Sequence, residues 1–162
     1  MRFVLAALTA TLFTGFAFAQ SPGVTVALKM SPIGSFEAKS SALKGVAKKA
    51  GAGITASGIT LPLSTLTTGM GLRDNHMKDK YLEVKKYPEA VVTMASGSGG
   101  KGKAKLKMRG VEKEVEGTYK VVGAFVEAQF EIKLSDFNIT GIRYQGIGVK
   151  DTAQVTAVVP LQ

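Results

Sequence analysis

The chain has 162 residues, 45% of them hydrophobic, and its 21 Lys and Arg outnumber its 12 Asp and Glu, which gives a formal net charge of +9. Because it has no cysteine and one histidine, disulfides, thiol chemistry and a zinc site of several cysteine or histidine ligands are excluded. The length suits one domain with its own core. The positive charge directs attention to nucleic acid, anionic membranes and acidic polymers as partner classes.

The first segment, MRFVLAALTATLFTGFAFAQ, has the layout of a secretory signal peptide. Arg2 supplies the positive charge, residues 3–16 form an apolar run, and Ala-Phe-Ala at residues 17–19 fits a cleavage site. The run is shorter than the roughly 20 apolar residues that a membrane-spanning helix needs. We therefore expect residues 1–19 to be cleaved and residues 20–162 to form one exported, periplasmic domain with no integral membrane segment.

After this segment, apolar residues recur at every second position, as they do in a strand with one buried face. The clearest case is AFVEAQFEIKL, residues 124–134. The same alternation appears in residues 24–30, 50–63, 90–96, 111–122 and 149–159. Glycine-containing breaks separate these segments, so the pattern predicts a meandering antiparallel sheet in one all-β domain.

The basic run KGKAKLKMR, residues 101–109, alternates lysine with small or apolar residues. A two-residue turn at Arg109-Gly110 would fold it back on the next strand. The lysines then meet glutamates in the pairs Lys107–Glu112, Lys105–Glu114 and Lys103–Glu116. Opposite charges across a strand pair favour this register. Proteins that bind single-stranded nucleic acid need aromatic residues between their basic ones. This run has none, so we predict no nucleic-acid partner.

The polar segment of residues 71–88, GLRDNHMKDKYLEVKKYP, breaks the alternation and predicts a short helix near residues 69–80 that caps one end of the sheet. Thr67 or Thr68 can cap its N-terminus, and Asp74 and Lys78 are spaced to share an exposed face. Arg73, Asp74 and His76 form a cluster that has the residue types of a catalytic or metal site.

Catalysis by this cluster would need further partners. The chain has no Gly-x-Ser-x-Gly nucleophile elbow, and its one histidine, His76, is too few for a zinc site. We therefore predict no catalytic residue, metal or cofactor, and expect a protein that is not an enzyme. A hydrolase or isomerase that uses His76 is the rival hypothesis.

Four segments resemble the YceI-like family. Residues 67–96 carry its pattern of Thr-Gly, Arg-Asp-x-His, an aromatic-apolar pair and Lys-Tyr-Pro, while residues 102–115, 130–141 and 149–159 are similar to its strand–turn–strand unit and its two closing strands. The pattern is formed here by Thr68, Gly69, Arg73, Asp74, His76, Met77, Tyr81, Leu82, Lys86, Tyr87 and Pro88.

The resemblance implies an antiparallel, eight-stranded, lipocalin-like barrel with a short helix near one end. It also implies an apolar tunnel that holds a long isoprenoid, a quinone or a similar amphipathic lipid, in a carrier, a reservoir or a stress-related sequestering protein. About eight strands leave room for one slender ligand, and burying its chain needs no reactive side chain. A homodimer is an open alternative to a monomer.

The predicted cavity lining is the inward-facing set of the alternating strands. It comprises Ile54, Met94, Leu106, Met108, Val126, Ala128, Phe130, Ile132, Leu134, Val155 and Ala157. The same side chains would form an ordinary filled core if no ligand binds. Arg73, Asp74, His76 and Tyr81 are predicted at the cavity mouth, where Arg73 would hydrogen-bond a polar head group.

The alternative function is a basic interaction module without a lipid ligand, which binds an anionic surface or a protein partner. It requires one uncompensated patch of lysines. The candidates are Lys44, Lys48, Lys49, Lys85 and Lys86.

Overall fold

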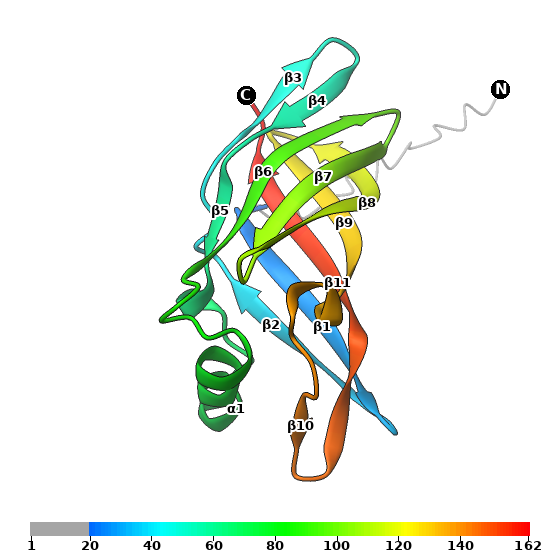
Figure 1. Cartoon of the computed structure of the whole chain (residues 1–162). Helices are drawn as coiled ribbons and strands as arrows, with labels where there is room; N and C mark the ends of the chain where they lie inside the picture. Colours follow the sequence, from blue (N-terminus) through cyan, green and yellow to red (C-terminus); the bar gives the residue numbers. More distant parts are fainter. Residues whose placement is uncertain (1–19) are drawn as a thin grey trace, which may run out of the picture.

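The computed structural model describes residues 20–162, which form mainly antiparallel β-structure with one short α-helix (Figure 1). The predicted signal peptide lies outside the described residues. Within those residues, no helix is both long enough and apolar enough to span a membrane.

Seven strands of six residues or more build most of the sheet. They are β1 (Gly23–Ser31), β2 (Ser35–Ser40), β6 (Glu89–Ser98), β7 (Lys101–Met108), β8 (Val111–Val122), β9 (Phe125–Lys133) and β11 (Ile147–Pro160). Four short strands extend it, namely β3 (Ala47–Ala50), β4 (Gly53–Ala56), β5 (Ile59–Pro62) and β10 (Arg143–Tyr144). The helical elements are η1 (Leu63–Thr65), α1 (Gly71–His76), the π-helical turn η2 (Met77–Tyr81) and η3 (Leu134–Phe137).

The strands form one sheet in the order β2-β1-β11-β9-β8-β7-β6-β4-β3, and β5 also pairs with β6. The sheet curls until chain segments next to its two ends meet (Figure 1). There, Lys39 exchanges two backbone hydrogen bonds with Thr67, and Lys44 exchanges two with Thr60, all of 2.9 Å. These bonds satisfy backbone groups that an open edge would leave unpaired.

The predicted all-β, antiparallel class with one short helix is confirmed, but the described residues form eleven strands rather than eight. Residues 50–63 explain part of the difference, because their single alternating pattern is divided into β4 and β5. Gly58 lies between these strands with φ of +65°, a left-handed conformation that favours glycine and interrupts an extended strand.

The predicted pairing of β7 with β8 is confirmed at every position, including Lys107 with Glu112 and Lys105 with Glu114. Arg109 and Gly110 both have positive φ, 49° and 74°, as a tight turn between right-twisted strands requires. Lys103 lies 2.9 Å from Glu116. These side chains are largely exposed, so they help to select the register more than they add stability.

Candidate functional site: an apolar cavity inside the curled sheet

The curled sheet encloses a cavity of about 470 Å³, within the range of roughly 300–1,000 Å³ that is usual for small-molecule sites. Its wall is built by alternate residues of the strands, because one face of each strand points inward. Apolar side chains such as Val26, Leu28 and Val92 make up most of it. The charged residues on the wall near α1 and β10 are Arg73 and Arg143. Lys103 and Glu116 of β7 and β8 also border the cavity, but their side chains are 61% and 69% exposed and pair with each other on the outer face.

The structure brings ten of the eleven predicted lining residues together on this wall. They are Ile54, Leu106, Met108, Val126, Ala128, Phe130, Ile132, Leu134, Val155 and Ala157. The prediction followed from the alternation of apolar residues along each strand. That these residues bind a ligand stays a prediction.

Met94 is the exception, and its predicted place in the lining is wrong. Val92 pairs with Leu106 but Met94 pairs with Lys105, so Thr93 is an extra residue in β6. Such a bulge reverses the alternation beyond it. Met94 is therefore 62% exposed on the outside of the sheet, and Ala95 lines the cavity in its place.

Side chains from four elements, α1, η2, β2 and β10, meet at the end of the cavity where the mouth is predicted. The guanidinium of Arg73 in α1 lies 4.4 Å from the ring centroid of Phe36 in β2. The His76 ring meets the Tyr144 ring of β10 edge-on, with centroids 5.7 Å apart. Arg73, His76 and Tyr81 all line the cavity; that they surround its mouth stays a prediction.

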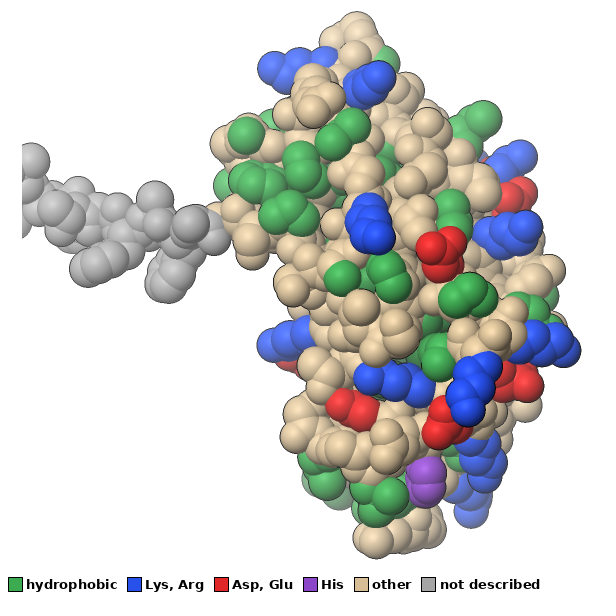
Figure 2. Space-filling model, turned by 90° about the vertical axis from the view of Figure 1, so that its left-hand side faces the viewer, with side chains coloured by type: hydrophobic (Ala, Val, Ile, Leu, Met, Phe, Trp, Pro, Cys, Tyr) green, Lys and Arg blue, Asp and Glu red, His purple; other side chains and the backbone are tan. Residues whose placement is uncertain are grey.

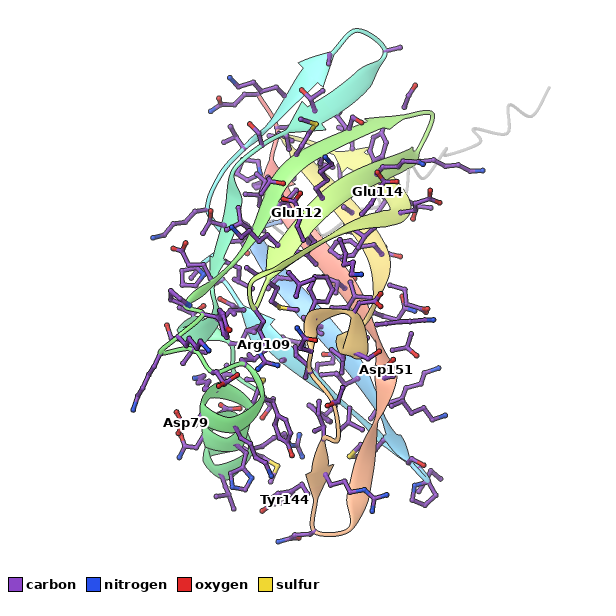
Figure 3. All side chains as sticks on the ribbon, viewed as in Figure 1. Asp79, Arg109, Glu112, Glu114, Tyr144 and Asp151 are labelled. Carbon is purple, nitrogen blue, oxygen red and sulfur yellow. The ribbon has the colours of Figure 1, made fainter. Side chains whose placement is uncertain are left out.

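Tyr81 joins η2 to β10 by a pair of hydrogen bonds. Its hydroxyl donates to the carbonyl oxygen of Arg143 at 3.3 Å and accepts from the Arg143 N–H at 3.2 Å. The helical segment and β10 therefore form two sides of one opening. Figure 3 labels Tyr144 on the β10 side of it. The sequence analysis missed β10, because residues 138–146 show no alternation.

Asp74 does not lie at the mouth as predicted, since it is only 9% exposed and its carboxylate is used inside the cap. It accepts hydrogen bonds from the hydroxyls of Thr67 and Thr68, both at 2.6 Å, and from the Thr68 N–H at 2.7 Å. Burial raises the pKa of Asp74, but these bonds and the charge of Lys78 outweigh it and lower the pKa overall.

The predicted N-cap is also wrong in detail. Met70 occupies the N-cap position of α1 and makes no side-chain cap bond. Instead, the helical Asp74 reaches back to Thr67 and Thr68, so the predicted threonines contribute as donors to a carboxylate rather than as acceptors for helix N–H groups.

Arg109 is a structural residue that the sequence analysis read only as part of a turn. Its guanidinium donates to the Glu83 carboxylate and to the Asn138 carbonyl oxygen, and it lies 5.7 Å from the Tyr87 ring centroid. Only 12% of the side chain is exposed. Arg109 thus joins the β7–β8 turn to the chain that follows η2 and to η3 (Figure 3).

Three glycines shape the wall of the cavity away from the helix. Gly97 pairs with Gly102, and Gly102 pairs with Gly117, so they form a row across β6, β7 and β8. A Cβ on Gly97 would lie 2.5 Å from the Tyr119 ring, and one on Gly117 would lie 2.3 Å from the Gln129 carbonyl oxygen. The glycines therefore admit the Tyr119 ring and the close approach of β9.

Asp151 of β11 holds η3 against the sheet. Its carboxylate accepts hydrogen bonds from the Ser135 hydroxyl at 2.6 Å and the Ser135 N–H at 2.8 Å. These bonds lower the pKa of Asp151.

Residues 20–162 contain no cluster of three or more His, Cys, Asp or Glu with the geometry to hold a metal ion. The arrangement suits the holding of an apolar molecule.

A family model describes this architecture. The model of the YceI-like domain matches residues 18–161. The chain belongs to the YceI-like family. Among curated proteins none matches it at a significant level.

Two solved structures share the fold of this YceI-like chain. BcnA of Burkholderia cenocepacia aligns with a TM-score of 0.64 and 19% identity, over 84% of this chain and 93% of its own. A polyisoprenoid binding domain from Saccharophagus degradans, implicated in plant cell wall breakdown, aligns with a TM-score of 0.55 and 13% identity, over 84% and 90% of the two chains.

Proposed function

We propose that the chain binds a long-chain isoprenoid, a quinone or a similar amphipathic lipid in the cavity. The observation that carries this proposal is a cavity of about 470 Å³ whose wall is almost entirely apolar. Membership of the YceI-like family supports it, as does the fold shared with a polyisoprenoid binding domain. The apolar chain would lie inside, with its polar head at the mouth beside Arg73, His76 and Tyr81.

The energetics favour a long chain over a short one. Burying a methylene group contributes about 0.8 kcal/mol, so about ten such groups would contribute roughly 8 kcal/mol. Association itself costs about 4–15 kcal/mol in lost freedom of motion. A ligand of only a few carbons therefore binds weakly, whereas a chain that fills the cavity offsets this loss.

The proposed role is containment rather than catalysis, in a carrier, a reservoir or a sequestering protein. No step requires a reactive side chain, because the interaction is burial of apolar surface. We also propose export to the periplasm, on the strength of the signal-peptide pattern in residues 1–19.

The basic-module alternative loses its required patch. Lys48 and Lys49 lie in β3, near the C-terminus, whereas Lys85 and Lys86 follow η2, toward the end that carries α1 (Figure 1). The five lysines proposed for it therefore do not form one surface.

Native mass spectrometry of the protein from a bacterial host, followed by lipid extraction, tests the proposal. We expect a stoichiometric long-chain species, and Ala128→Phe should exclude it by filling the cavity with an aromatic ring. Met94→Phe is the matched control, because this side chain lies outside the sheet. A protein that carries no lipid and takes up no added prenyl alcohol, quinone or fatty acid would show the proposal to be wrong, as would full occupancy of the Ala128→Phe variant.

A further inference from the structure

Exposed apolar side chains gather at the end of the molecule that carries α1 and β10, where Arg73, His76 and Tyr81 line the cavity. Ile33 is 84% exposed in the β1–β2 turn, Met70 and Leu72 are 48% and 55% exposed at the start of α1, and Ile147 is 41% exposed at the start of β11. In Figure 1, α1, the β10–β11 turn and the β1–β2 turn all lie at the lower end, spread across its width from left to right. Single exposed apolar residues need no explanation, but a group around one opening points to an interaction surface.

Contacts between the elements show that these tips belong to one rim. Ser31 of β1 pairs with Gly148 of β11, which places the β1–β2 turn beside the β10–β11 turn. The contact of Arg73 with the Phe36 ring and the edge-on contact of His76 with the Tyr144 ring bring α1 to β2 and β10. Ile147, Arg73 and His76 also line the cavity, so the rim is continuous with its mouth.

The rim also carries positive charge. Lys78 and Lys80 lie in η2 and Arg143 in β10, and none of the three forms a salt bridge within residues 20–162. The exposed acid of this segment, Asp79, lies on the side of the helix away from β10 (Figure 3), and the charge of Lys78 also acts on the buried Asp74. Three basic residues against one exposed acid leave the rim net positive. Figure 2 shows basic side chains in blue and hydrophobic ones in green beside the histidine at this end.

We propose that this rim, formed by Ile33, Met70, Leu72 and Ile147 with Lys78, Lys80 and Arg143, docks on the surface of an anionic lipid bilayer. The apolar tips enter the interface, as those of peripheral membrane proteins do, and the basic side chains bind anionic head groups. The proposal rests on the proposed function, since the mouth would then face the bilayer and a lipid would pass between bilayer and cavity without crossing water.

Flotation with vesicles tests the docking. The wild-type protein should bind vesicles of phosphatidylcholine with phosphatidylglycerol more tightly than vesicles of phosphatidylcholine alone, and high salt should weaken this preference. Ile33→Ser with Leu72→Ser should lower the binding by about tenfold or more. Lys78→Gln with Lys80→Gln should lower it by about fivefold per charge.

Matched controls lie at the other end of the molecule. Val121→Ser with Val122→Ser removes two apolar side chains of 49% and 40% exposure, and Lys48→Gln with Lys49→Gln removes two exposed lysines of β3. Both pairs should leave vesicle binding unchanged. All variants are expressed from the full chain, and intact mass identifies each N-terminus, so that proteins of equal length are compared.

Loading from detergent separates this proposal from the proposed function. A fluorescent prenyl alcohol delivered in detergent should enter the rim variants as it enters the wild type, while its transfer from vesicles slows. Loading from detergent without vesicle binding would overturn the docking alone, and vesicle binding without any loading would overturn the lipid-binding function alone. A dimer in solution that Ile33→Ser with Leu72→Ser dissociates would also overturn the docking, because a second copy would then cover the rim.

Discussion

The two ends of the curled sheet are held in different ways. At the mouth, α1 and η2 meet β2 and β10 mainly through side chains, such as Arg73 on Phe36 and His76 on Tyr144. At the far end the backbone makes the contacts: Ala47 accepts a 2.8 Å hydrogen bond from the Gln162 N–H, and β4 pairs with both β3 and β6.

This difference in construction has a consequence for motion. Contacts between exposed side chains contribute little individually and break without unfolding the sheet, whereas backbone ladders open only in larger cooperative units. The mouth is therefore the end that can open for a ligand, and the far end fixes the shape of the cavity. Four substitutions test this difference between the two ends.

The largest effect is expected in the glycine row. Gly117→Val places a side chain 2.3 Å from the Gln129 carbonyl oxygen, so β8 must separate from β9, and we expect a loss of at least about 3 kcal/mol in the free energy of unfolding. Denaturant unfolding measures it. Gly71→Ala is the control, because nothing lies within 4 Å of a Cβ there and alanine favours the helix. An equal loss of stability in both variants would contradict the conclusion that close backbone contacts between strands fix the shape of the cavity.

Arg109→Ala should have the next largest effect, because it removes the connection between the β7–β8 turn and the chain that follows η2. We expect a loss of about 1–3 kcal/mol, the usual range for a partly buried charged hydrogen bond. Relative to the wild type, hydrogen exchange in this variant should be accelerated more in residues 71–88 than in β9 and β11. Uniform acceleration over the whole sheet would indicate instead that Arg109 stabilises the far end equally.

Asp74→Asn should lower the free energy of unfolding by about 1–2 kcal/mol at neutral pH, because it weakens the hydrogen bonds that join α1 to Thr67 and Thr68. Because the pKa of Asp74 is lowered in the folded protein from its ordinary value of 3.8, its carboxylate stabilises the fold above that value, and this contribution is lost as pH falls through the folded-state pKa. The stability gap between wild type and variant should therefore narrow below about pH 4. A gap that stays constant from neutral to acid pH would contradict the role of the charged carboxylate.

The smallest effect is expected for His76→Ala, which removes one ring contact at the mouth. The free energy of unfolding should change by less than about 0.5 kcal/mol, and the lipid content should stay the same while the ligand exchanges faster. Stopped-flow exchange of a fluorescent prenyl alcohol measures the rate. Loss of a hydrolytic or isomerising activity in this variant, with lipid content intact, would favour the enzyme hypothesis instead.

The amino-acid sequence alone predicts the all-β class, the place of the short helix, the register of β7 with β8 and ten of the cavity-lining positions. These features follow from local patterns: alternation sets the face of each side chain, and opposite charges with a two-residue turn set the register. The resemblance to the YceI-like family added the expectation of a cavity, which alternation alone does not distinguish from a filled core.

Only the tertiary structure decided the orientation of Met94, the burial of Asp74 and the second side of the mouth at Tyr144. A bulge depends on how β6 meets β7, and no residue near Thr93 marks it in the sequence. Asp74 and the residues of β10 acquire their roles from partners distant in the chain or across a loop, such as Tyr81 for Arg143. The contact of Tyr81 with Arg143, 62 residues away, arises only when the chain folds, because folding brings together segments whose sequences carry no sign of one another. The Asp74 contacts span only six and seven residues, but the sequence does not show which of these side chains is buried.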